Sequence, residues 1–310
     1  MEGRKIRDVA GAALTIASTI DRRYLQPLVV TVASLVEHLP TGTPVRLFVL
    51  HDGLTAADLR HLEAFVHVEA IAPPLDRLAG LPVRRPFTRE AYFPLLLPDV
   101  LPTALDRVLF LDADLLVLDD LTPLWTVDLE GAPVAAVADG AIPLVSSPRG
   151  LAAYRALGIP AAAPYFNAGV MLMDLGAWRR EAVTPRAIEF LRSARRVDFL
   201  HQEALNAVLW NRWRPLPSRW NVLAGLAGRF DVALPDVPAI AHFAGRFKPW
   251  LMAVGGPFGP DYRRALDRWR LSDESSPAPG LGARLAGFYD RRVRKRLYPL
   301  ERALWNRRLL

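Results

Sequence analysis

Short apolar segments alternate with amphipathic ones along the first part of the chain. Residues 14–18, 45–50 and 68–71 are apolar enough to form buried strands. The two segments between them, 27–38 and 56–67, have helical spacing, with Pro27 in the first turn of one helix and Thr55 as the N-cap of the other. Strands that alternate with helices at these lengths predict an α/β fold with a parallel sheet.

The run VLFLDADLLVL, residues 108–118, organises the rest of the chain. Its first four residues fit a strand buried on both faces, and Asp112 and Asp114 follow where that strand ends. Burying an isolated ionised carboxylate is costly, so a pair at the tip of an apolar strand indicates a cation or a ring of donors. An acidic turn is the alternative. Ligands of open α/β sheets bind beyond the carboxyl ends of the strands, which places a site here.

Other polar residues also fall at the ends of predicted strands. Further strands are predicted over 133–137, 170–174 and 239–241. The polar residues at strand ends are Asp21, Asp112, Asp114, Asp139, Asn167 and His242. Singly, each is more often a turn or cap residue than a ligand. Together, we expect them to meet on one rim of one doubly wound sheet.

The remaining pattern defines the other helices and the domain boundaries. Helices are predicted over 90–97, from Thr122, from the segment 201–206 and over 262–271, and residues 73–86 form a loop. Residues 1–271 are predicted to form one α/β domain. The Ser-, Pro- and Gly-rich segment 272–282 is predicted to be a linker, and residues 283–310 a basic amphipathic helical tail.

Composition restricts the chemistry more than the fold. The chain has 310 residues, of which 51% are hydrophobic, and no cysteine, so thiolate catalysis and thiolate metal sites are excluded. Two carboxylates and an imidazole suit Mn²⁺, with Mg²⁺ as the alternative ion. No apolar run is long enough to span a bilayer, and no signal peptide is evident, so we expect a cytoplasmic protein.

The formal net charge of +7 is concentrated at the C-terminus. From Leu281 onward the chain has nine Lys or Arg residues and two acidic residues, between apolar residues at helical spacing. This pattern favours peripheral binding to an anionic membrane surface on the cytoplasmic face, and we expect no nucleic-acid partner. A helix packed on the domain with its arginines in solvent is the alternative.

Three more residues invite a chemical interpretation. Lys248, six residues after His242 on a glycine-containing loop, is placed to reach an anionic ligand such as a diphosphate, although a solvated lysine fits equally well. Gln202 and Glu203 stand at a predicted helix start, where capping is a serious alternative to catalysis.

Four motifs together resemble glycosyltransferase family 8, the group of glycogenin and the bacterial lipopolysaccharide α-galactosyl- and α-glucosyltransferases. They are VLFLDADLLVLDDLTPLW, YFNAGVMLMDL, HQEALNAVL and HFAGRFKPW, and the likeness covers roughly residues 12 to 252. The resemblance implies a GT-A fold. It also implies Mn²⁺-dependent, retaining transfer of a hexose, galactose or glucose, from a UDP-sugar to a glycan or glycolipid acceptor, as in lipopolysaccharide biosynthesis.

The resemblance also implies roles for individual residues. Asp112, Asp114 and His242 would be the metal ligands. The donor-binding residues would be Thr19, Asp21, Tyr24, Ala113, Asp139, Asn167, Ala168, His201, Gln202, Gly245 and Lys248. Within that set, Asp21 and Tyr24 would hold the uracil and Ala113 would lie against the ribose. Gly245 and Lys248 would contact the diphosphate. Gln202 would lie beneath the anomeric carbon with Glu203 behind it, and these two are the predicted catalytic residues.

Three positions depart from the family pattern. Pro94 stands where the family has an arginine, for which Arg89 is a candidate substitute; His201 replaces an aspartate, and Arg23 replaces an asparagine. These departures motivate one alternative, a nucleotide-sugar-binding relative that has lost transfer. A haloacid dehalogenase-type phosphohydrolase is less favoured, because its D-x-D motif normally continues with Thr or Val and this chain has Leu115.

Overall fold

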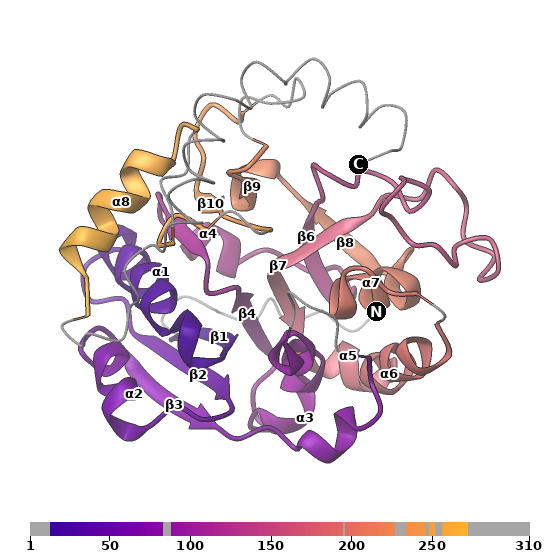
Figure 1. Ribbon diagram of the computed structural model, residues 1–310, viewed down its shortest axis with the longest axis horizontal. Coiled ribbons are helices and arrows are strands. Elements are labelled where there is room, and N and C mark those ends of the chain that lie inside the picture. Colours follow the sequence, from indigo (N-terminus) through magenta and orange to yellow (C-terminus); the bar gives the residue numbers. More distant parts are fainter. Residues whose placement is uncertain are drawn as a thin grey trace, which may run out of the picture.

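A seven-stranded sheet forms the centre of the protein (Figure 1). The computed structural model describes residues 13–82, 88–194, 196–226, 234–245, 248–251 and 256–271. Within these ranges the strand order is β3-β2-β1-β4-β7-β6-β8. The strands are β1 (Leu14–Ile20), β2 (Val45–His51), β3 (His67–Ile71), β4 (Arg107–Leu111), β6 (Val134–Ala138), β7 (Phe166–Asp174) and β8 (Trp213–Leu216). Only β7 runs antiparallel to its neighbours, so the predicted mostly parallel α/β sheet is confirmed.

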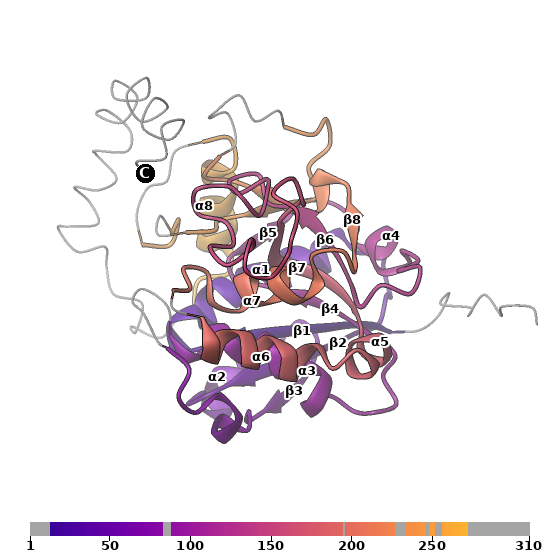
Figure 2. The same cartoon turned by 90° about the vertical axis from the view of Figure 1, so that its right-hand side faces the viewer.

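Helices cover both faces of this sheet because its strands are apolar on both faces. Along β4, Val108 and Phe110 join one hydrophobic cluster, and Leu109 and Leu111 join the other. One face packs against α1 (Leu25–His38), α2 (Ala56–Glu63) and α4 (Thr122–Trp125). The other packs against α3 (Leu97–Val100), α5 (Leu175–Arg180), α6 (Val183–Ser193) and α7 (Leu200–Leu209). Figure 2 shows α5, α6 and α7 on the near side.

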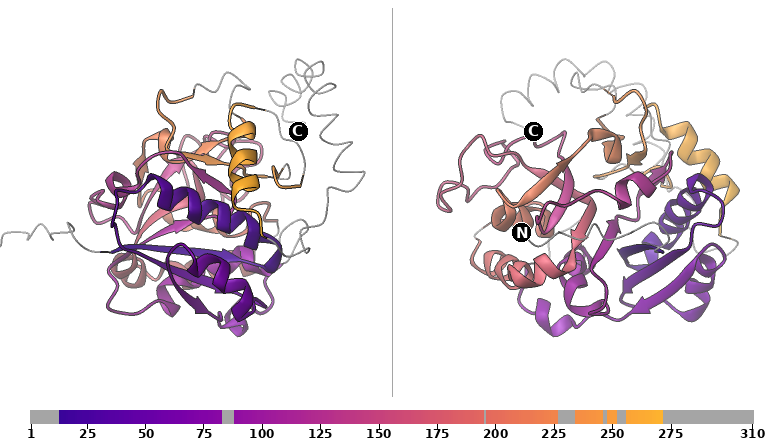
Figure 3. Two further views of the ribbon diagram at one scale, coloured as in Figure 1. Left: turned by 90° about the vertical axis from the view of Figure 1, so that its left-hand side faces the viewer. Right: turned by 180° about the vertical axis from the view of Figure 1, so that it is seen from behind.

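A second, smaller sheet lies beside the first. It contains β5 (Leu115–Val117), β10 (Ile240–His242) and β9 (Val222–Leu223), in the order β5-β10-β9. Helix α8 (Gly259–Arg268) contributes Tyr262 and Leu266 to a cluster with Leu116 and Phe243 of this region. Figure 3 shows α8 beside α1 at the edge of the molecule. The second sheet carries one side of the candidate site.

The expectation of one rim of one sheet is wrong in two respects. The chain turns at residues 112–114 and enters β5 of the second sheet, and His242 is the last residue of β10, which belongs to that second sheet and not to the first. Asn167 lies near the start of β7, not after the end of a strand. Because β7 is antiparallel to β4, its beginning falls at the same edge as the end of β4.

Several predicted boundaries also differ. The predicted helix over 90–97 is a 3₁₀ helix, η3 (Arg89–Leu96), which runs into α3, since Pro94 and Pro98 remove donors that a continuous α-helix needs. Helix α2 ends at Glu63, and α5, α6, β5, β8 and β9 are not anticipated by the pattern. None of the described helices is long and apolar enough to cross a bilayer. The predicted linker and basic tail, residues 272–310, lie outside the described residues.

Candidate active site

Buried hydrogen bonds hold the turn between β4 and β5. The hydroxyl of Thr31 on α1 donates to the carbonyl of Ala113 at 3.0 Å and accepts from the amide of Leu115 at 3.2 Å. The amide of Asp112 donates to the carbonyl of Gly169 on β7 at 2.8 Å. The turn is therefore tied to a helix and to a strand, which fixes where its two aspartates project. Ala113, predicted to lie against the ribose, is buried in this turn.

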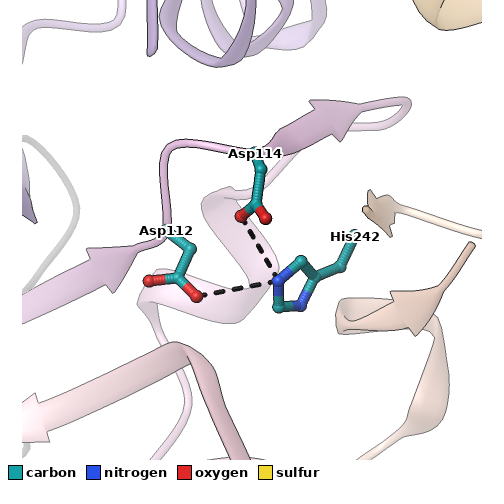
Figure 4. Close-up of side chains that lie close together, drawn as sticks. All are labelled: Asp112, Asp114 and His242. Atoms are coloured by element: carbon teal, nitrogen blue, oxygen red, sulfur yellow. Dashed lines mark ion pairs between the residues drawn. The ribbon is translucent and has the colours of Figure 1, made fainter. Parts of the chain in front are cut away.

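The two aspartates converge on an imidazole from the second sheet (Figure 4). His242 Nε2 lies 3.3 Å from Asp114 Oδ1 and 3.6 Å from Asp112 Oδ2. One ligand atom from each of the three residues lies within 4.8 Å of the others. The side chains of Asp114 and His242 are buried, whereas that of Asp112 is 33% exposed and opens the cluster to one side. The structure therefore brings together the three residues predicted as metal ligands.

A glycine on the neighbouring strand makes room for this cluster. A Cβ atom on Gly169 would lie 2.3 Å from His242 Cε1 and 2.8 Å from Asp112 Oδ2. Both distances are far below ordinary van der Waals contact. Only glycine fits at this position while the imidazole and the carboxylate stay where they are.

The charges in the cluster depend on one another. Burial, together with repulsion from Asp114, raises the pKa of Asp112. Burial opposes ionisation of Asp114 as well, but the charges of Lys248 and His242 outweigh it and lower the pKa of Asp114. Burial alone would lower the pKa of His242, yet Asp114 and Asp112 raise it. The cluster is therefore an anionic pocket that stabilises positive charge at its centre.

Lys248 is the cation nearest to these carboxylates in the described part of the chain. Its ammonium group forms an ion pair with Asp114 and donates to the carbonyl of Phe243 at 2.9 Å. It lies 5.8 Å from the ring centroid of Tyr24 and 5.5 Å from that of Trp250, and the two rings pack edge to face. Although burial opposes it, the charge of Asp114 raises the pKa of Lys248, so the ammonium stays protonated.

A network of buried amides connects His242 to the other side of the site. His242 Nδ1 lies 2.9 Å from Asn221 Oδ1, and the Asn221 amide donates to Asn167 Oδ1 at 2.9 Å. Asn167 donates to Asp139 Oδ2 at 2.9 Å, and Gln202 donates to the same oxygen at 3.2 Å. Asp139, Asn167 and Gln202, all predicted donor-binding residues, are thus joined by direct hydrogen bonds, and Asn221 links them to His242. Ala168 belongs to the same group, because its amide donates to Gln202 Oε1 at 3.0 Å.

Asp21, Thr19 and Gly245 are three further residues predicted to bind the donor. Asp21 caps the short 3₁₀ turn η1 (Arg22–Tyr24) and forms an ion pair with Arg23, the residue that replaces the family's asparagine. Thr19 lies two residues earlier, near the end of β1. Gly245 is exposed and has a φ of +87°, a conformation that side-chain-bearing residues rarely adopt. None of these three residues is linked to the metal cluster by a hydrogen bond among the described residues.

Glu203 and His201, two predicted site residues on α7, have different surroundings from Gln202. The carboxylate of Glu203 accepts hydrogen bonds from the amides of Asp198 and Phe199, at 2.7 and 3.4 Å, just before the helix begins. Glu203 therefore satisfies amides at the start of α7. Both ring nitrogens of His201 are buried, and burial outweighs an interaction with the Ala91 backbone and lowers the pKa of His201 to about 4.

One residue of the site, Asn221, was not predicted from the sequence pattern. Asn221 follows Trp220 in the loop before β9 and is only 4% exposed, yet it is the partner of His242 Nδ1. No local spacing distinguishes it from an ordinary loop asparagine, because its two side-chain partners are 21 and 54 residues away in the chain.

The donor set fits a divalent cation. Two carboxylates and one imidazole face one another, and the repulsion between the carboxylates, which Lys248 offsets in part, favours a proton or a cation at the centre. Oxygen and nitrogen ligands without sulfur suit Mn²⁺ or Mg²⁺, and the open side at Asp112 leaves positions for ligand oxygens.

Comparison with known proteins assigns this fold and site to a class. The family model described as Glycosyl transferase family 8 matches residues 15–253. The galactosyltransferase LgtC, solved in complex with donor and acceptor sugar analogues, superposes with a TM-score of 0.71 at 25% identity, over 84% of this chain and 98% of that one. The chain belongs to glycosyltransferase family 8, and the expected GT-A fold is confirmed.

Relatives of known name are similar over most of their length. General stress protein A of Bacillus subtilis (strain 168) is 27% identical, over 85% of this chain and 96% of that protein. Lipopolysaccharide 1,2-glucosyltransferase of Escherichia coli (strain K12) is 26% identical, over 84% of this chain and 80% of that enzyme. Probable galacturonosyltransferase-like 3 of Arabidopsis thaliana is 30% identical, over 76% and 74%.

Proposed function

We propose that the protein transfers a hexose from a UDP-sugar to a glycan or glycolipid acceptor, with retention of anomeric configuration and with Mn²⁺ held by Asp112, Asp114 and His242. The observation that carries this proposal is the convergence of these three side chains, from two separate sheets, in a member of a glycosyltransferase family. The phosphohydrolase alternative does not agree with that family membership.

The names of the relatives support a sugar nucleotide donor but leave the sugar open. One relative is a glucosyltransferase, one structure is a galactosyltransferase with donor and acceptor analogues, and another relative is a galacturonosyltransferase-like protein. Two of the similar proteins act in lipopolysaccharide synthesis by name, which supports a glycolipid acceptor. Glucose and galactose are therefore the first donors to test.

Departure of UDP places negative charge next to Lys248. A bound divalent cation would act as a Lewis acid on the diphosphate oxygens. The ammonium of Lys248, which pairs with Asp114 in this structure, is the protein's own positive charge at this point. A diphosphate that enters the pocket competes with Asp114 for this ammonium. Stabilisation of developing charge by a preorganised group of this kind typically contributes about 3 kcal/mol.

The groups on the proposed sugar side of the site bear on how transfer with retention would proceed. Gln202 is buried and its amide is oriented by Ala168 and Asp139. An amide is a weak nucleophile, so a covalent glycosyl intermediate on Gln202 is disfavoured. Glu203 is a stronger nucleophile, but its carboxylate is occupied by backbone amides. We therefore favour attack by the acceptor on the face that UDP leaves, with a phosphate oxygen of UDP accepting the acceptor's proton.

A nucleotide-sugar-binding relative without transfer is the remaining alternative, because of His201 and Pro94. His201 places a buried imidazole where the family has a carboxylate, and Pro94 lies buried inside η3. Neither residue interrupts the network from His242 to Gln202.

Release of UDP from a panel of UDP-sugars distinguishes transfer from binding alone. The assay is run with Mn²⁺, with Mg²⁺ and with EDTA, and His242→Ala serves as the inactive control. We expect UDP release from at least one UDP-hexose with Mn²⁺ and none with EDTA. Tight binding of UDP-sugars without UDP release, in the presence of varied saccharide acceptors, would favour the binding protein. Equal release by wild type and His242→Ala would refute the metal assignment.

A further inference from the structure

In the hydrogen-bond network behind His242, Asp139 determines which groups donate and which accept. Asp139 Oδ1 accepts from the amides of Ala141 and Ile142, at 2.8 and 3.0 Å. Its Oδ2 accepts from the side-chain amides of Asn167 and Gln202. A carboxylate has about four acceptor positions, and all are filled. Because a carboxylate only accepts, Asn167 must present its NH₂ group to it and its oxygen to the opposite side.

The orientation of Asn167 is fixed a second time by the main chain. The amide of Gly169, which can only donate, is 2.9 Å from Asn167 Oδ1. The same oxygen lies 2.9 Å from Asn221 Nδ2, so Asn221 must present its own NH₂ group to Asn167. The remaining oxygen of Asn221 then faces His242 Nδ1 at 2.9 Å. An oxygen without a proton requires a donor, so the proton of the neutral imidazole is on Nδ1.

We propose that Asn221 is a positioning residue that holds His242 in the Nδ1–H tautomer and keeps its Nε2 lone pair available between Asp112 and Asp114. The inference rests on the proposed cation site and extends it by one residue. Groups that hydrogen-bond the second nitrogen of a metal-ligating histidine fix its tautomer and orientation. Asn221 performs that role with an amide whose own direction is set by Asn167 and, through it, by Asp139.

The network also joins the two halves of the site. His242 comes from β10 of the small sheet, and Asn167 comes from β7 of the large sheet. Asn221, in the loop before β9, bonds to both. The same chain of hydrogen bonds continues to Gln202 on α7, the residue predicted beneath the sugar. The metal ligand and the sugar side of the pocket therefore share one set of orienting contacts.

Four proteins test the role of Asn221: wild type, Asn221→Leu, Asn221→Asp and Asn206→Ala. Asn221→Leu removes the acceptor at similar side-chain size. Asn221→Asp keeps an oxygen facing Nδ1 but sets a second oxygen against Asn167 Oδ1, which lowers stability. Asn206 is the matched control, because it is a fully buried asparagine whose side chain bonds, among the described residues, to the backbone of Phe166 and Gln202 alone.

Binding of Mn²⁺ alone is measured by the electron paramagnetic resonance signal of the free ion, and folding is followed by thermal unfolding of the same samples. We expect Asn221→Leu to bind Mn²⁺ on the order of 10- to 100-fold more weakly. Asn221→Asp should bind at least as tightly as wild type despite a lower Tm, and Asn206→Ala should lose stability without losing affinity. If Asn221→Leu does not fold, Asn221→Ala takes its place with the same expected direction.

The outcomes separate this inference from the proposed function. Absence of Mn²⁺ binding by folded wild type would overturn the cation site and the inference with it. Wild-type affinity in folded Asn221→Leu would overturn the positioning role and leave the cation site standing. Equal losses in Asn221→Leu, Asn221→Asp and Asn206→Ala would mean that affinity follows stability alone, which also overturns the positioning role.

Discussion

A single methyl group at position 169 should disable the site without unfolding the protein. In Gly169→Ala the new Cβ atom would lie 2.3 Å from His242 Cε1, whereas ordinary contact begins at 3.4 Å. The imidazole or strand β7 must therefore move by about 1 Å, a misplacement that typically costs about 100-fold in rate. This corresponds to roughly 2.7 kcal/mol of transition-state stabilisation. The backbone itself tolerates alanine, because Gly169 does not have a positive φ.

UDP release with Mn²⁺ and Mn²⁺ affinity are the two measurements for this variant. Added volume in a packed region costs about 1–3 kcal/mol of stability, so thermal unfolding must show a folded protein at the assay temperature. Gly176→Ala is the control, since its new Cβ atom would meet the flexible end of Arg180 at 3.1 Å, away from the cluster. Wild-type affinity and turnover in folded Gly169→Ala would refute the packing of His242 and Asp112 against β7.

Three further predictions test separate parts of the site. Asp114→Asn should abolish UDP release and lower Tm, because the isosteric amide loses a metal ligand and leaves the buried ammonium of Lys248 without its charge partner; undiminished release by the folded variant would remove Asp114 from the metal site. Gln202→Ala should reduce turnover far more than affinity for UDP, measured by calorimetry, if Gln202 contacts the sugar as proposed; equal losses would mean that it serves binding only. The pKa of His201 falls from 6.5 to about 4 on folding, so its neutral form stabilises the fold above pH 6.5, and this contribution is lost as the pH falls through 4. The loss is on the order of 3 kcal/mol, and His201→Phe should reduce it in urea unfolding between pH 7 and pH 4; parallel profiles for the two proteins would contradict the assignment.

The first half of the fold is visible in the sequence because its signals are local. The apolar runs at 14–18, 45–50 and 68–71 correspond to β1, β2 and β3, and Thr55 caps α2 with a reciprocal bond to Asp58 as an N-cap should. These strands are consecutive along the chain and adjacent in the sheet. Strand order and direction follow there from the crossover rule alone.

The second half depends on pairings between distant segments. Nothing in the run 108–118 indicates that its last residues leave the main sheet and pair with β10, more than a hundred residues later. The direction of β7 is hidden for a similar reason, since a strand buried on both faces has the same apolar pattern in either direction. Short strands such as β9, Val222–Leu223, carry too few residues for any periodicity.

The sequence predicted the chemical groups of the site better than their arrangement in space. The sequence alone shows residue types that suit a metal and an anionic ligand: two carboxylates after β4, an imidazole and a lysine. Their partners require the structure: Lys248 pairs with Asp114, and Asp21 pairs with Arg23. The capping alternative for Glu203 agrees with its bonds to two amides before α7.

Anomalous diffraction at the manganese edge, from crystals soaked in Mn²⁺ and UDP, tests the central claim most directly. We predict one strong peak at coordination distance from Asp112, Asp114 and His242 Nε2, with diphosphate oxygens of UDP on its open side. A peak elsewhere, or UDP bound with no metal at these three residues, would contradict the account.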